Sequence, residues 1–145
     1  MHHLFQSLRV GLRLSPLNSF NSMRDSDPVG LASWMATRLN DFRLAYLHLM
    51  RSDFFGEQQG DVLTPVCERY QGVLIANMGY TVEEAEAAIA SGKIDAVAFG
   101  TAFLANPDLP ARIKAGAPLN PPNPATFYTS GPAGYTDYSF WEKNG

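Results

Sequence analysis

The chain has 145 residues, of which 46% are apolar and 17% charged, which is enough for one globular domain, residues 1–145, with a buried core. A formal net charge of −3 without a basic run provides no field for nucleic acid and no charged surface for a membrane. Cys67 is the only cysteine, so an internal disulfide is excluded. No stretch approaches the roughly 20 consecutive apolar residues that span a bilayer. Because Met1-His2-His3 also lacks the apolar core of a signal peptide, we expect a cytoplasmic protein with no nucleic-acid or membrane partner.

The first predicted strand covers residues 10–15 and contains Arg13 between Leu12 and Leu14. Side chains alternate along a strand, so Arg13 faces away from both leucines. An in-strand arginine can serve as an ion-pair partner, as a charge at the rim of a barrel, or as a ligand contact. The strand pattern alone leaves these roles open.

A helix is predicted to begin at Asp27-Pro28, because an N-cap aspartate followed by a proline at the first helical position is a helix-start signal. Apolar residues then recur at helical spacing and predict one face packed on a sheet. We expect Trp34 and Met35 to be core residues of this face, whose members are Leu31, Trp34, Met35 and Leu39.

The second predicted strand, residues 42–50, is almost continuously apolar, as expected for a strand covered on both faces. His48 lies within it and is interpreted as a core residue. The loop that follows has the composition of a functional or mobile segment. Arg51 could meet a ligand there, but we interpret it as a solvated surface charge.

Thr64-Pro65 is predicted to cap a short helix in which Cys67 fills core space. No histidine is near Cys67 in sequence, so the residues give no support to a nucleophilic role. A capping box at residues 81–84 predicts a further helix that runs to Gly92. Its adjacent glutamates are explained by the helix dipole rather than by acid–base chemistry.

Two further strands are predicted at residues 72–76 and 94–99, each followed by turn residues and then by a helix-start signal. The second of these helices is predicted to start at residues 106–108 and to stop at Gly116. Successive βα units with turn residues at the ends of their strands indicate a parallel sheet with its ligand at the carboxyl ends of the strands. The two loops at those ends are residues 77–81 and 100–103.

Several short motifs in a fixed order make the chain recognisable: VGLRLSP near the start, then VAFG, ANPDLP, PLN, TFY and GYTDY. Together they resemble the carboxyl-terminal half of an old yellow enzyme, an FMN-dependent NAD(P)H oxidoreductase and ene-reductase, from about Arg9 to the end of the chain. The resemblance implies an α/β fold that is half of a TIM (β/α)8 barrel. About four βα units would correspond to strands 5 to 8, followed by an aromatic-rich C-terminal tail.

The chemistry implied by the resemblance is hydride transfer from NAD(P)H through FMN to a small activated alkene. Arg13 would face the flavin ring, and Phe127 and Tyr128 would fold over it; the other interpretation is that the six aromatic side chains of the tail simply pack against the barrel. The phosphate would be held by the two carboxyl-end loops. The implied cofactor-binding residues are Arg13, Met78, Gly79, Gly100, Thr101, Phe127 and Tyr128.

Two residues depart from the family pattern in the phosphate loops. Met78 stands where a glycine is usual, and Thr101 stands where an arginine is usual. Both changes weaken the expected phosphate contacts. The family's catalytic residues lie on strands that this chain does not contain, so no catalytic residue is assigned, and no metal site is predicted.

Three functions remain open from the sequence. The first is the FMN-binding half of an oxidoreductase, incomplete without an N-terminal half. The second is a non-catalytic structural or interaction remnant that has lost productive FMN binding. The third is a half barrel for another phosphorylated ligand. Because four strands of an eight-stranded barrel leave open edges, we expect a homo-oligomer or a complementing N-terminal half-barrel chain.

Overall fold

The structure is a computed structural model and describes residues 9–141. The chain divides into two compact units, Met1–Ala98 and Phe99–Gly145. The first unit holds the sheet and three helices. The second holds two short helices and the tail.

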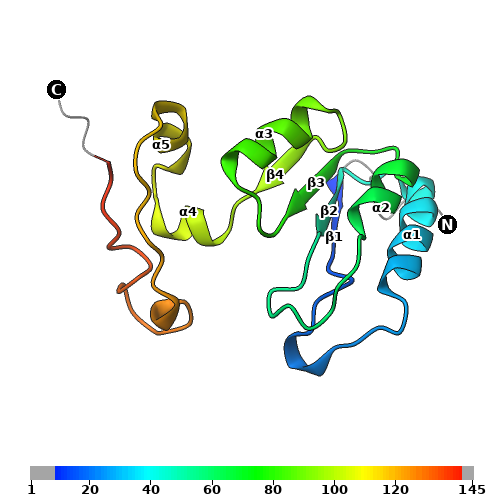
Figure 1. Cartoon of the computed structure of the whole chain (residues 1–145), viewed down its shortest axis with the longest axis horizontal. Helices are drawn as coiled ribbons and strands as arrows, with labels where there is room; N and C mark the ends of the chain where they lie inside the picture. Colours follow the sequence, from blue (N-terminus) through cyan, green and yellow to red (C-terminus); the bar gives the residue numbers. More distant parts are fainter. Residues whose placement is uncertain (1–8, 142–145) are drawn as a thin grey trace. The chain divides into compact units, whose positions relative to one another are not determined.

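Four parallel strands form the sheet of the first unit in the order β1-β2-β3-β4 (Figure 1). They are β1 (Gly11–Leu14), β2 (Tyr46–Met50), β3 (Leu74–Asn77) and β4 (Ala96–Ala98). Each strand lies where the sequence predicts one, and β3 extends one residue further, to Asn77. The parallel sheet and the α/β class are therefore confirmed.

Three α-helices alternate with these strands: α1 (Pro28–Leu39), α2 (Leu63–Arg69) and α3 (Val82–Ala90), with 3-10 turns η2 (Phe20–Ser22) and η3 (Asn40–Phe42). The Asp27 carboxylate caps α1 by accepting from Gly30 N at 2.9 Å. The capping box of α3 is formed in both directions between Thr81 and Glu84. For α2 the prediction of a Thr64 cap is wrong, because Asp61 Oδ1 accepts from Thr64 N at 3.0 Å.

The hydrophobic core lies on one face of the sheet, against α1 and α2. Alternate strand residues supply it, including Leu47, Leu49 and Ala76, which are all fully buried. Val66 of α2 and Cys67 next to it pack into the same cluster, which confirms a packing role for Cys67.

Helix α1 meets this core through a different stripe from the predicted one. Ala32, Ala36 and Leu39 are its buried residues, whereas Trp34 is 60% exposed. The prediction of Trp34 as core is wrong, and only Met35 of the pair packs against the cluster. Small alanines let the helix backbone lie close to the sheet, so volume rather than hydrophobicity decides which stripe turns inward.

The other face of the sheet carries a different set of side chains, here called the Arg13 face. Strand pairing places Arg13, His48 and Ile75 in one row, and Met50 and Asn77 in the next. None of these residues belongs to the hydrophobic core cluster. His48 is half-buried there, so its placement in the core is corrected.

The second unit contains α4 (Thr101–Ala105), α5 (Leu109–Ala115) and η4 (Pro124–Thr126). Residues 100–103 were predicted as a loop, but α4 already begins at Thr101. Helix α5 ends as expected at Gly116, whose φ of 62° is left-handed. Within this unit Tyr128, Tyr135 and Phe140 are exposed, so the helices of the second unit do not cover these aromatic side chains of the tail.

Buried polar side chains hold the tail of this unit to its helices. Arg112 is 4% exposed, pairs with Asp108 at 2.7 Å, and donates to Pro118 O and Ser139 O at 2.6 and 2.8 Å. Asn106 and Asn120 bond to each other in both directions. The motifs ANPDLP and PLN are thus connected to each other by side-chain hydrogen bonds.

Candidate functional site

Arg13 presents its guanidinium on the Arg13 face of the first unit, beside His48 of the neighbouring strand. Its side chain is exposed, and its one hydrogen bond goes from Nη2 to Met50 Sδ at 3.6 Å. Within residues 9–141 no carboxylate lies within 4.0 Å of it. A cation with only a weak sulfur acceptor can interact with an electron-rich ligand.

Two buried polar atoms lie on the same face of the sheet as Arg13, one on β2 and one on β3. His48 Nε2 and Asn77 Oδ1 are both buried and have no hydrogen-bond partner among the described residues. Burial and the positive charge of Arg13 lower the pKa of His48 and outweigh the opposing effect of the Asn77 side chain, so the neutral imidazole is favoured. Buried polar atoms without partners are costly, so this face has the features of a ligand-binding surface.

The segment from Asn77 to Thr81 forms a tight turn at the carboxyl end of β3. Met78 and Gly79 adopt left-handed conformations, with φ of 81° and 66°. For a non-glycine residue this conformation costs about 1–2 kcal/mol. The turn therefore requires glycine-like geometry at Met78, the position where the sequence departs from its family.

Arg51, at the end of β2, fastens this turn. Its Nε donates to Met78 O at 2.7 Å, and its Nη2 donates to Gly79 O at 2.9 Å and to the Glu84 carboxylate at 3.2 Å. The guanidinium also stacks on the Tyr80 ring, 3.6 Å from its centroid. The interpretation of Arg51 as a solvated surface charge is wrong, because the side chain is held by four groups and is only 27% exposed.

The loops that follow β1 and β2 are joined around the buried carboxylate of Asp53. It accepts from the backbone N–H groups of Ser19, Phe55, Glu57 and Gln58 at 2.9 to 3.4 Å. Burial opposes ionisation of Asp53, but hydrogen bonds from Ser19, Gln58 and Phe55 outweigh it and hold the pKa well below its usual range.

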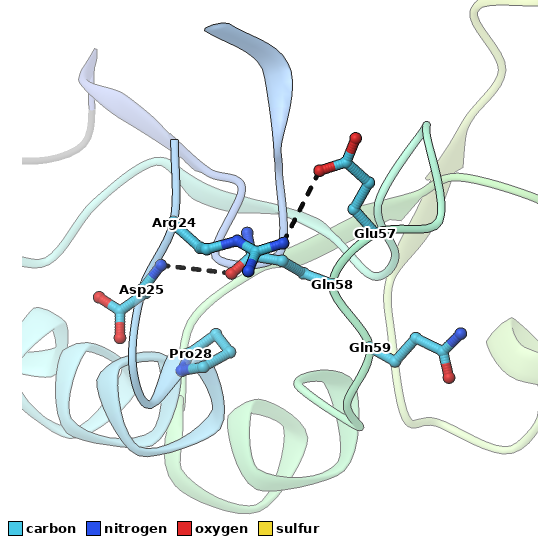
Figure 2. Close-up of a pocket in the computed structure, with 6 residues that line it drawn as sticks. All are labelled: Arg24, Asp25, Pro28, Glu57, Gln58 and Gln59. Atoms are coloured by element: carbon cyan, nitrogen blue, oxygen red, sulfur yellow. Dashed lines mark hydrogen bonds and ion pairs between the residues drawn. The ribbon is translucent and has the colours of Figure 1, made fainter. Parts of the chain in front are cut away.

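A shallow polar pocket lies between the same two loops and the start of α1 (Figure 2). Arg24 and Glu57 pair across it at 3.9 Å, and Asp25 N donates to the Gln58 side chain at 3.2 Å. Both charged side chains are more than 60% exposed. This pocket is a solvated junction between loops, without a buried group aimed at a ligand.

The remaining predicted residues belong to the second unit. Gly100 is the N-cap residue of α4, and Thr101 is its exposed first residue. Phe127 is half-buried and Tyr128 almost fully exposed. Their roles toward a cofactor stay predictions.

The sequence reasoning found Arg13, Met78 and Gly79, which lie on the first unit at or near the carboxyl ends of β1 and β3. It did not single out Asn77, and it named Arg51 but interpreted it as a solvated surface charge. Strand alternation could have found Asn77, because it is two residues after Ile75 and so shares the face of His48. No helix of residues 9–141 is long and apolar enough to cross a membrane, and no metal-ligating cluster occurs in that range.

Residues 3–120 match the model of the NADH:flavin oxidoreductase / NADH oxidase family. The chain belongs to this family. It is 54% identical over 132 residues to the "Probable flavin mononucleotide-dependent alkene reductase" of Leishmania infantum, covering 91% of this chain and 36% of the relative. It is also 43% identical over 135 residues to 12-oxophytodienoate reductase 2 of Arabidopsis thaliana, covering 90% of this chain and 36% of that protein.

Solved structures agree with these matches. The old yellow enzyme from Trypanosoma cruzi superposes with a TM-score of 0.89 at 47% identity, over 92% of this chain and 36% of that one. Morphinone reductase superposes with a TM-score of 0.82 at 38% identity, over 94% of this chain and 38% of that one. The old yellow enzyme resemblance and the partial TIM barrel are confirmed, and the chain spans little more than a third of the length of these relatives.

Proposed function

We propose that this chain carries part of the FMN-binding site of an old yellow enzyme-type ene-reductase, in which hydride passes from NAD(P)H through FMN to an activated alkene. The observation that carries the proposal is the exposed guanidinium of Arg13, which has no carboxylate partner among the described residues. Such a cation favours the electron-rich end of a flavin ring. The flavin, when bound, supplies the hydride chemistry.

The residues of the Arg13 face fit this ligand. A neutral His48 and the Asn77 amide offer buried polar atoms without partners, which can bond to the polar edge of a flavin ring. The backbone of Met78 and Gly79 would approach the phosphate, and only Arg51 Nη2, at 3.8 Å, lies near the position of a Gly79 Cβ. In the same proposal Gly100 and Thr101 assist the phosphate, and Phe127 and Tyr128 cover the ring.

The two departures from the family pattern set the expected affinity. A methionine side chain at position 78 crowds a backbone that must approach phosphate oxygens, and Thr101 lacks the charge of an arginine. The loss of one charge-assisted hydrogen bond corresponds to roughly one to two decades in affinity. We therefore expect weak FMN binding rather than none.

Flavin fluorescence titration of the full chain tests the proposal. We expect the unmodified chain to bind FMN. Arg13→Ala should lower the affinity for both FMN and riboflavin by about tenfold, because Arg13 contacts the ring that both ligands share. Arg38→Ala removes another exposed arginine, from α1, and serves as the matched control. A colourless chain that ignores both ligands would support the alternative, a structural module without productive flavin binding.

A partner chain is also part of the proposal. Strands β1 and β4 are the edges of the sheet, and Leu31 and Trp34 of α1 are exposed, so the unit presents unpaired backbone and apolar surface. We expect self-association or pairing with a chain that supplies the other strands. Light scattering that shows a soluble monomer at micromolar concentration would contradict this.

A further inference from the structure

The turn at the end of β3 has an uneven distribution of hydrogen bonds. Its carbonyls at Met78 and Gly79 are both occupied by Arg51. Among the described residues, no acceptor is found for the backbone N–H groups of Met78, Gly79 and Tyr80, whereas the next N–H, that of Thr81, is bound by Glu84. One side of the turn is therefore fastened, and the other side offers donors.

Peptide planarity connects these two observations. In a trans peptide the C=O of one residue and the N–H of the next point in opposite directions. Because Met78 O and Gly79 O both point at Arg51, the N–H groups of Gly79 and Tyr80 must point away from its guanidinium. Arg51 thus fixes the direction of two consecutive donors that it does not itself contact.

The positive charge of Arg51 is partly neutralised by an ion pair on the same side of the turn as the bound carbonyls. Its Nη2 pairs with the Glu84 carboxylate at 3.2 Å, and a hydrogen bond from Thr81 N and the bond from Arg51 both lower the pKa of Glu84, so the carboxylate is ionised. The Tyr80 ring lies under the guanidinium at 3.6 Å. A partly neutralised, stacked arginine is built to hold a shape rather than to attract a distant anion.

We propose that Arg51 is a positioning residue for the phosphate end of the flavin: it locks the peptide planes of the Met78–Tyr80 turn so that the Gly79 and Tyr80 N–H groups face the phosphate. This deepens the proposed function and rests on it. The hydrogen bonds from Arg51 to Met78 O and Gly79 O also explain how the turn keeps its left-handed geometry with a methionine at position 78. Consecutive N–H groups presented in this way form an anion-binding concavity.

Titration of the full chain with FMN and riboflavin tests the role of Arg51. Arg51→Ala removes the hydrogen bonds to the two carbonyls of the turn. We expect FMN affinity to fall about tenfold, while riboflavin, which lacks the phosphate, binds as before. Arg69→Ala is the matched control, because Arg69 also donates to a backbone carbonyl and a glutamate but lies in α2. It should change neither affinity.

Arg51→Lys separates positioning from charge and serves if the alanine variant does not fold. A lysine keeps the positive charge but lacks the planar fork that reaches both carbonyls and Glu84, so we expect at least a fivefold loss of FMN affinity. Full FMN affinity in Arg51→Lys, or an equal loss for riboflavin in either variant, would overturn the assignment.

NMR spectra of the backbone amide groups, recorded during titration with inorganic phosphate, give a second measurement. The Gly79 and Tyr80 signals should shift in the unmodified chain and should respond much less in Arg51→Lys. If the unmodified chain does not prefer FMN over riboflavin, the phosphate site itself is wrong, and the Arg51 assignment fails with it. A preference that persists in Arg51→Ala refutes only the role of Arg51.

Discussion

The two faces of the sheet are made from the same strands, yet their side chains serve different purposes. In β2, Leu47 and Leu49 are fully buried in the core, while His48 between them holds a buried nitrogen without a partner. In β1, Leu12 packs against the core and Arg13 is exposed. The alternation of a strand thus separates the residues that stabilise the fold from those available to a ligand, one position apart.

The largest expected effect comes from the core face. Leu49→Ala should lower the free energy of unfolding by about 3 kcal/mol, because it leaves a cavity in a fully buried cluster. Ile75→Ala, on the Arg13 face, should cost about 1 kcal/mol, since Ile75 is half-buried and outside the cluster. Urea unfolding of both variants measures the difference, and equal costs would mean that the two faces contribute alike.

The second prediction concerns the ligand side. Met78→Gly with Thr101→Arg should raise FMN affinity by roughly one to two decades, because glycine suits the left-handed turn and arginine supplies a fork for phosphate oxygens. Riboflavin binding should hardly change, since it lacks the phosphate. Fluorescence titration of both ligands decides this. An equal gain for riboflavin would show that these positions do not serve the phosphate.

The third and smaller expected effect is on the pH dependence of stability, through Asp53 in the loop that follows β2. The folded-state pKa of Asp53 lies below its ordinary value of 3.8, so its carboxylate contributes stability that is present above that value and lost as pH falls through the folded-state pKa. Asp53→Asn should therefore be less stable than the unmodified chain at pH 7. The gap should narrow on acidification below about pH 4.

Thermal unfolding across this pH range, followed by circular dichroism, measures that gap. Asp41→Asn provides the control, because Asp41 forms only an exposed ion pair with Arg38 at 3.8 Å. A constant difference between Asp53→Asn and the unmodified chain at all pH values would contradict the assigned role of the carboxylate.

The smallest expected effect is on the solvent side of α1. Trp34→Ala should change the free energy of unfolding by less than about 0.5 kcal/mol, because the indole is 60% exposed. Ala36→Leu, two residues further along on the buried stripe, should destabilise the fold by about 1–3 kcal/mol through overpacking. Guanidinium unfolding of the pair checks the observed orientation of α1, and a large loss in Trp34→Ala would contradict it.

Local signals predicted most of the fold. The capping box of α3 and the Asp27 cap of α1 were correct because their partners lie three residues away. The buried stripe of α1 was predicted wrongly, since hydrophobicity favours Trp34 while the space beside the sheet fits Ala32 and Ala36. Helix α4 was missed because it has only five residues and begins directly after Gly100, where a phosphate-binding loop was expected.

The site was less predictable, because its contacts join residues far apart in sequence. Arg51 bonds to residues 27, 28 and 33 positions away, and nothing near Arg51 in the chain signals them. The Arg13 face, by contrast, follows from alternation once the register of β1, β2 and β3 is known. Sequence therefore indicated which residue types stand at the strand ends, but not which groups hold them.

The carboxylate of Asp53 has a consequence for how this chain can diverge over evolutionary time. It accepts hydrogen bonds from four backbone N–H groups, those of Ser19, Phe55, Glu57 and Gln58. Every amino acid except proline can donate such a bond. Phe55 and Glu57, whose side chains are exposed, can therefore be exchanged for any residue but proline without loss of these backbone hydrogen bonds, so descendants could vary the chemistry presented there while the bonds to Asp53 are kept.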